Sequence, residues 1–146
     1  MSTGDKIEKT IVLRAPRSRV WRALTIAEEF QTWFRAKIEG AFEVGATVKA
    51  RSTYPGHENA TWEMRIEEMV PESFFAFTWP QDAEMKDVAT WNRVEFRLED
   101  VPEGTRLTMV ESGFDRLPED RRVATLKDNE EGWTLQMENI ARHVEG

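Results

Sequence analysis

The sequence predicts an α+β domain in which an antiparallel sheet packs against one long C-terminal helix. Five segments between residues 43 and 112 have the length and apolar content of strands, and most of them alternate apolar and polar side chains. Two short amphipathic segments precede them, and from about Pro118 the apolar residues recur at helical spacing. Because helices and strands are segregated along the chain, we expect the helices to lie against one sheet.

Length and composition favour a single domain spanning residues 1–146. A chain of this size buries roughly 70% of the surface that its unfolded form exposes, so it can build one substantial core. The sequence has no cysteine, which excludes disulfides and thiolate metal sites. Its two histidines, His57 and His143, lie far apart in the chain. We therefore expect neither a metal site nor a cofactor.

Charge and hydropathy narrow the range of partners. The net charge of −7 argues against a nucleic-acid partner, which requires a basic face. No stretch approaches the roughly 18 to 20 apolar residues that a membrane span needs, and the first nine residues are polar. From this pattern we expect a cytoplasmic protein without a membrane span.

The N-terminal third predicts a strand followed by two short helices. Residues 7–14 read as the strand, and Pro16 suits the first turn of a helix that continues to about residue 24. Thr25 and Glu28 have the spacing of a capping box, which predicts the start of a second helix. That helix presents an aromatic face made of Phe30, Trp33 and Phe34.

The central part predicts a meander of strands joined by turns. Within residues 60–70, Trp62, Met64 and Ile66 point to one side while charged residues point to the other. Residues 74–79 are apolar on both faces, which is typical of a central strand or of one beneath a helix. The other expected strands are residues 43–54, 88–100 and 105–112.

The closing helix carries one apolar stripe. Trp133, Met137, Ile140 and Val144 follow each other at steps of four, three and four residues. Glu130 interrupts the stripe, so the helix either breaks near residues 127–130 or is less buried in its first half. Gly132 stands beside Trp133, although glycine costs a helix roughly 1 kcal/mol relative to alanine. We interpret it as a packing device that lets the helix backbone approach its neighbours.

Three segments carry a resemblance to a known superfamily. They are "IVLRAPRSRVWRALTIAEEFQTWF", "TRLTMVESGF" and "EGWTLQMENIARHV". The chain resembles the helix-grip, or Bet v 1-like, superfamily of START and polyketide-cyclase domains over roughly residues 6 to 145. Within it, the chain is similar to the branch named for the C-terminal domain of the activator of Hsp90 ATPase. The resemblance implies a curved antiparallel sheet gripping the C-terminal helix, with a mostly apolar cavity between them, and it transfers no catalytic residue.

Glu111 is the most informative polar residue. Alternation places it on the face of Leu107 and Met109, pointing toward the closing helix. A carboxylate there is either a ligand-binding or proton-transferring group or a strand-end carboxylate that bonds backbone N–H groups or solvent. Asn92 shares the face of Val94 and Phe96 and is a second candidate for contact with a polar ligand group.

The aromatic residues are the remaining candidates for a ligand site. Those expected to face the space between sheet and helix are Trp33, Trp62, Phe77, Trp79 and Trp133, with Met137 beside them on the helix. Each of them also suits ordinary core packing. Trp91 is expected on the outer face, where an exposed tryptophan would indicate an interface.

Three functions remain open at this stage. The first is a protein that binds an apolar or amphipathic small molecule under the closing helix. The second is a cyclase- or hydrolase-like enzyme that uses Glu111 as an acid or base, the only catalytic candidate. The third is a chaperone-linked or other interaction module, and a homodimer pairing through an outer face is a further expectation.

Overall fold

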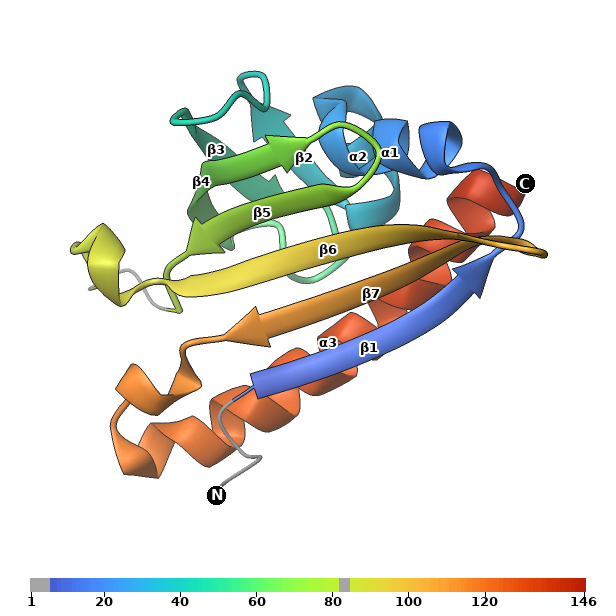
Figure 1. Ribbon diagram of the computed structural model, residues 1–146. Helices are drawn as coiled ribbons and strands as arrows, with labels where there is room; N and C mark the ends of the chain where they lie inside the picture. The colour runs from blue at the N-terminus through green and yellow to red at the C-terminus, as the bar shows by residue number, and fades with distance from the viewer. Residues whose placement is uncertain (1–5, 82–84) are drawn as a thin grey trace.

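The computed structural model describes residues 6–81 and 85–146, and within them one antiparallel sheet carries three α-helices (Figure 1). The strand order is β1-β7-β6-β5-β4-β3-β2. The strands are β1 (Lys6–Leu13), β2 (Ala36–Glu39), β3 (Thr47–Ser52), β4 (Thr61–Val70), β5 (Phe74–Trp79), β6 (Asn92–Val101) and β7 (Gly104–Ser112). The helices are α1 (Arg17–Thr25), α2 (Ala27–Phe34) and α3 (Glu119–Glu145), with 3-10 turns η1 (Val88–Thr90) and η2 (Phe114–Arg116). The predicted α+β helix-grip fold is confirmed.

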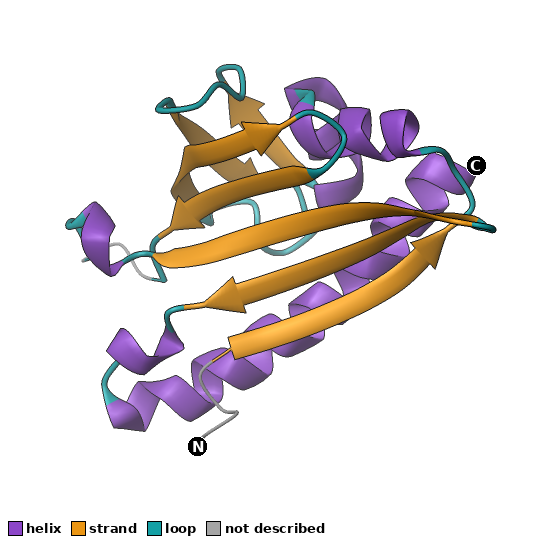
Figure 2. Ribbon diagram, viewed as in Figure 1, coloured by secondary structure: helices purple, strands orange, loops and turns teal. Residues whose placement is uncertain are grey.

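One long-range pairing organises the sheet. Strand β1 pairs with β7, the last strand, so that Ile7 lies opposite Glu111 and Leu13 opposite Thr105. The two short helices then carry the chain from β1 at one edge of the sheet to β2 at the other (Figure 2). From β2 onward every strand pairs with its neighbour in sequence, which is the expected meander.

Helix α3 packs its stripe against the sheet, running alongside β1 and β7 (Figure 1). Trp133, Met137, Ile140 and Val144 are all buried, as the spacing predicts. The helix is continuous through residues 127–130, and its first half is the less buried one, since Val123 is 73% exposed. The second of the two alternatives for this region is therefore correct.

One local expectation is wrong, and one short strand was missed. The capping box does not form, because Thr25 belongs to the last turn of α1 and its hydroxyl donates to the Trp21 carbonyl at 2.7 Å. Ile26 occupies the N-cap position of α2 without a side-chain cap. Strand β2 was not expected at all, because four residues are too few to show a period.

Gly132 does not act as a packing device. It is exposed, and a Cβ added to it would meet no atom within 4 Å beyond the helix's own backbone. Trp133 follows it on the buried side of α3. The glycine therefore gives the helix no close approach, and only its conformational cost remains.

We predict that Gly132→Ala raises the free energy of unfolding by about 0.5–1 kcal/mol, because alanine loses less backbone entropy in a helix and has room for its methyl group. Urea denaturation followed by circular dichroism measures this. The matched change Gly104→Ala should destabilise by at least about 1 kcal/mol, since Gly104 has a φ of +148° and its Cβ would collide with the Leu13 carbonyl oxygen. A loss of stability in Gly132→Ala would contradict the open environment described above.

Candidate functional site

A fully buried carboxylate, Glu111, lies at the centre of a ring of hydrogen-bond donors. The indole N–H groups of Trp79 and Trp133 each donate to it at 2.8 Å, one to each carboxylate oxygen. Asn92 donates through Nδ2 at 3.1 Å, and Asn129 donates to both oxygens at 3.2 and 3.3 Å. Gln81 makes the longest contact, at 3.4 Å. We call these six residues the Glu111 cluster.

The donors reach Glu111 from both layers of the fold. Trp79 ends β5, Gln81 follows it, and Asn92 begins β6. Asn129 and Trp133 are four residues apart on α3 and so project from the same face of that helix. Gln81 also accepts a hydrogen bond from Asn129 at 2.9 Å, which closes the ring. The cluster therefore ties α3 to the sheet at one end of the core.

Burial is the main influence on the Glu111 carboxyl. It raises the pKa of Glu111 above its ordinary value, and the hydrogen bonds from Trp133, Trp79, Asn92 and Asn129 oppose this rise without cancelling it. All of the described donors are uncharged side chains, so no cation offsets the desolvation. A carboxyl with a raised pKa can exchange a proton closer to neutral pH than an exposed one.

Aromatic rings in mutual contact occupy the layer between α3 and the sheet. Trp133 lies with its ring centroid 5.9 Å from those of Trp79 and Phe96 and 6.0 Å from that of Phe34. Phe77 is fully buried 5.2 Å from Trp79, and Met137 is buried on α3. Where the resemblance implied an apolar cavity, these rings pack against each other at ordinary contact distances.

The structure brings four of the predicted site residues together and separates the others. Glu111, Asn92, Trp79 and Trp133 meet in one cluster. Phe77 and Met137 lie in the core around it. Trp33 is also in the core, where its indole N–H donates to the Ala23 carbonyl at 2.8 Å. Trp62 lies elsewhere, at a pocket described below.

Two members of the cluster were missed by sequence reasoning. Asn129 could have been identified from the sequence, because it precedes Trp133 by one helical turn and so shares its face of α3. Gln81 could not, since it sits in a polar stretch between two strands with no periodicity.

Trp91 corrects the expectation of an exposed outer-face tryptophan. Its side chain is only 4% exposed, and its indole N–H donates to the Met85 carbonyl at 2.6 Å. Trp91 lies just outside β6, which begins at Asn92, so strand alternation does not fix its direction. It is buried because the chain that leads into β6 folds back over it.

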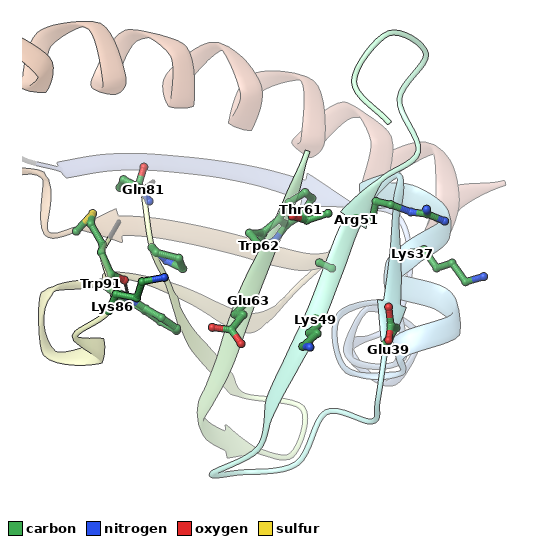
Figure 3. Close-up of a pocket in the computed structure, with 13 residues that line it drawn as sticks. Lys37, Glu39, Lys49, Arg51, Thr61, Trp62, Glu63, Gln81, Lys86 and Trp91 are labelled. Carbon is green, nitrogen blue, oxygen red and sulfur yellow. Dashed lines mark hydrogen bonds between the residues drawn. The ribbon is translucent and has the colours of Figure 1, made fainter. Parts of the chain in front are cut away.

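A pocket of about 940 Å³ lies where β4 and β5 diverge (Figure 3). The two strands pair only as far as Arg65 and Thr78. One wall comes from β2, β3 and β4, and the other from Pro80, Gln81, Met85, Lys86 and Trp91. The first wall contributes Lys37, Glu39, Lys49, Ala50, Arg51, Thr61, Trp62 and Glu63. We call this the β4 pocket, and Gln81 belongs to both it and the Glu111 cluster.

The β4 pocket exposes an open strand edge. The Ile66 N–H bonds Ala46 and the Ala60 carbonyl accepts from Ser52, so even-numbered backbone groups of this strand face β3. The backbone groups of Thr61 and Glu63 consequently face the gap, where β5 no longer pairs with them. The indole Nε1 of Trp62 is also buried without a hydrogen-bond partner.

The described residues hold neither a metal-binding group of side chains nor a membrane-spanning helix. No group of three or more histidine, cysteine, aspartate or glutamate side chains in residues 6–81 and 85–146 is arranged to hold a metal ion. In that same part of the chain, no helix is both long enough and apolar enough to cross a membrane.

Comparisons with known proteins identify the relatives of this chain. The family model described as "Activator of Hsp90 ATPase homolog 1-like protein" matches residues 14–145. No curated protein matches the chain.

Solved structures share the fold along nearly the whole chain. A protein from Mesorhizobium loti is 22% identical with a TM-score of 0.77, covering 94% of this chain and 95% of its own. The Aha1 dimer from Colwellia psychrerythraea is 19% identical with a TM-score of 0.76, covering 96% of each chain. A protein from Arthrobacter aurescens is 16% identical with a TM-score of 0.78, covering 97% of this chain and 86% of its own. At these identities the likeness concerns the fold.

We predict a pH dependence of stability that arises from Glu111. Below its ordinary pKa of 4.5 the carboxyl is protonated in both folded and unfolded chains. As the pH rises, the unfolded chain ionises first, so the contribution of Glu111 to the free energy of unfolding falls until the pH passes the raised folded pKa. The free energy of unfolding of the wild type minus that of Glu111→Gln should therefore decrease as the pH rises above about 4.5.

Urea denaturation of both proteins between pH 4 and pH 8 measures that difference. Glu131→Gln, at an exposed position of α3, is the control and should keep a constant offset from the wild type across this range. A difference between wild type and Glu111→Gln that grows with pH would mean that the cluster favours the ionised form and holds the pKa low.

Proposed function

Because the chain belongs to the family of activator of Hsp90 ATPase homolog 1-like proteins, we propose that it binds a small amphipathic molecule, as the helix-grip fold commonly does. We place this molecule in the β4 pocket, with the Glu111 cluster at its inner end. The observation that carries the proposal is the pocket itself. Its volume of about 940 Å³ falls within the range of about 300–1,000 Å³ typical of small-molecule sites.

The lining of the β4 pocket supports an amphipathic ligand. Trp62 lies on one wall and Met85 on the other, and both side chains are half-buried, so apolar surface borders the space from both sides. Charged side chains of β2, β3 and β4 surround this apolar surface. A ligand with an apolar body and one polar group would bury the body against Trp62 and Met85 and keep the polar group near the charged side chains.

Gln81 offers a route from the pocket to the buried carboxylate. It lines the pocket and makes the longest of the contacts to Glu111, at 3.4 Å. A ligand hydroxyl or amide that took over this contact would replace one neutral donor with another, so the carboxylate would remain satisfied. Glu111 could then orient the bound ligand, which is the ligand-binding role considered for it from the sequence.

A second candidate function rests on the burial of Glu111. A carboxyl whose pKa is raised by desolvation is suited to act as a general acid or base on a bound molecule. If the chain is an enzyme, Glu111→Gln should abolish turnover of a bound compound while the protein stays folded. If it is only a binding protein, the same variant should change affinity without any chemical conversion to lose.

We predict that a small molecule stabilises the protein and that filling the β4 pocket abolishes the effect. Native mass spectrometry of the purified chain should show a bound small molecule, and thermal denaturation with a panel of fatty acids, aromatic acids, their amides and alcohols should show at least one stabilising compound. A ligand at 100 times its Kd adds about 2.7 kcal/mol to the free energy of unfolding.

The native mass spectra also report the oligomeric state. The dimer seen for the Colwellia psychrerythraea protein leads us to propose self-association here too.

The matched variants are Thr61→Trp and Thr47→Trp. Both residues are exposed on neighbouring strands, but only Thr61 lines the pocket. Thr61→Trp should remove the ligand-dependent stabilisation while Thr47→Trp keeps it. If Thr61→Trp responds to the stabilising compound like the wild type, the molecule binds elsewhere and the β4 pocket is not the site.

A further inference from the structure

We propose that Asn92 is a proton-dependent switch for Glu111. Its amide turns over when the carboxyl takes up a proton, so that Oδ1 accepts the new O–H group. The proposal concerns the Glu111 cluster alone and goes beyond the ligand binding proposed for the β4 pocket. It gives the buried carboxyl a satisfied arrangement in both protonation states, which a general acid or base requires.

The ring around Glu111 fits the ionised form and leaves the protonated form unsatisfied. The two indoles and three amides that contact the carboxylate all donate to it. An ionised carboxylate is an acceptor only, so this set suits it. A protonated carboxyl also carries an O–H donor, and a buried donor without an acceptor costs free energy. Uptake of a proton therefore requires one member of the ring to become an acceptor.

Asn92 holds a spare acceptor at the right place. Its side chain is fully buried, with Nδ2 at 3.1 Å from Glu111 Oε2 and Oδ1 without a hydrogen-bond partner. The oxygen and nitrogen ends of an amide are nearly the same size, and the surrounding hydrogen bonds decide which end faces which way. Half a turn about the Cβ–Cγ bond brings Oδ1 to the carboxyl. No bond is lost on the far side, because the atom there was unpartnered.

The other two amides of the cluster cannot do the same. Gln81 Oε1 already accepts from Asn129 Nδ2 at 2.9 Å. Turning Gln81 over would set its amino group against that of Asn129, and turning Asn129 over would break its contacts with both carboxylate oxygens. Within the described part of the chain, Asn92 is thus the amide of the cluster that can reverse without losing a bond to a third residue.

Gly113 provides the room for this movement. It lies beside Asn92, since a Cβ added to it would come within 2.7 Å of Asn92 Oδ1. The same point lies 3.2 Å from Nη1 of Arg116. A cation on this side favours the amide oxygen there while Glu111 is ionised. The O–H group of protonated Glu111 supplies the opposing preference, so the orientation of the amide follows the charge of the carboxyl.

The other described groups around Glu111 carry no charge that competes with it. Its cross-strand neighbours are Ile7 on β1 and Val94 on β6, and both are apolar. On α3, the charge of Glu130 is already balanced by an ion pair with Lys9 at 3.4 Å. We therefore expect the switch to respond to the protonation of Glu111 itself.

Infrared spectroscopy tests whether Asn92 serves both forms of the carboxyl. The C=O stretch of protonated Glu111 is the difference between a protein and its Glu111→Gln counterpart, and its growth from pH 8 to pH 4.5 gives the ionisation constant. Trp79→Phe removes a donor that serves the ionised form alone, so it should lower that constant about tenfold. Asn92→Ala removes a donor from one form and an acceptor from the other, so the constant should change by less than about threefold. Trp133→Phe removes the other indole donor and replaces Trp79→Phe if circular dichroism shows that variant to be unfolded.

Nuclear magnetic resonance follows the amide directly. Cross-peaks between the Asn92 side-chain amide protons and the α protons of Gly113 should be weak in the wild type at pH 8, where Oδ1 lies over the glycine. They should strengthen as Glu111 becomes protonated. Glu111→Gln is neutral and carries an N–H donor, so it should show strong cross-peaks already at pH 8. Glu131→Gln, at an exposed position of α3, is the control and should keep them weak.

Three results would overturn the switch. An equal tenfold fall in Asn92→Ala and Trp79→Phe would make Asn92 a fixed donor. Cross-peaks that stay weak in Glu111→Gln would show that the amide does not turn over. Absence of a carboxyl band down to pH 4.5 would mean that Glu111 takes up no proton. Neither measurement uses a ligand, so these results leave the proposed binding in the β4 pocket untouched, and a failure of that binding would leave the switch standing.

Discussion

A carboxylate cannot remain in an apolar core unless donors surround it, and the position of Glu111 makes this the central constraint of the structure. Its place on β7 is fixed by alternation with Leu107 and Met109, so it must point toward α3. The chain meets the requirement with uncharged donors drawn from β5, β6 and α3. Satisfying one side chain therefore fixes the relative positions of helix and sheet at this end of the core.

The choice of donors has a consequence for packing. Trp79 and Trp133 each supply one N–H to Glu111 and a large ring to the layer between α3 and the sheet. With Phe34 and Phe96 against Trp133, the same residues that satisfy the carboxylate also fill the space around it. The interior of this helix-grip fold is thus occupied by its own side chains, and the described cavity lies farther out.

The β4 pocket lies where β4 and β5 stop pairing. Pairing of β4 with β5 ends at Arg65 and Thr78, and the chain after β5 turns away before it returns as β6. The separation leaves an open strand edge, and Trp91 and Gln81 lie on its far side. Among the described residues, Gln81 is the one that touches both regions, which makes it a physical link between the β4 pocket and the buried carboxylate. Substrate or ligand chemistry in this protein is best sought along that line.

The features that the sequence determined by itself are the ones set by local periodicity. The strands of the meander, the stripe from Trp133 to Val144 and the inward face of Glu111 all follow from periods of two or 3.6 residues, which are read along a single segment. These patterns, together with the family resemblance, were enough to predict the α+β fold. They also identified four members of the Glu111 cluster, because those side chains lie on the inward faces of their elements.

Only the tertiary structure decided what covers each face. Trp91 was expected to be exposed, yet it is buried and donates to the Met85 carbonyl, and nothing local to Trp91 encodes that contact. Gly132 stands on an open face of α3 although its neighbour is a buried tryptophan. Gln81 joins the cluster from a stretch without periodicity, and the pocket arises where pairing between strands stops. Burial and cavities depend on segments distant in the sequence, so a pattern within one segment indicates a direction and cannot indicate what lies there.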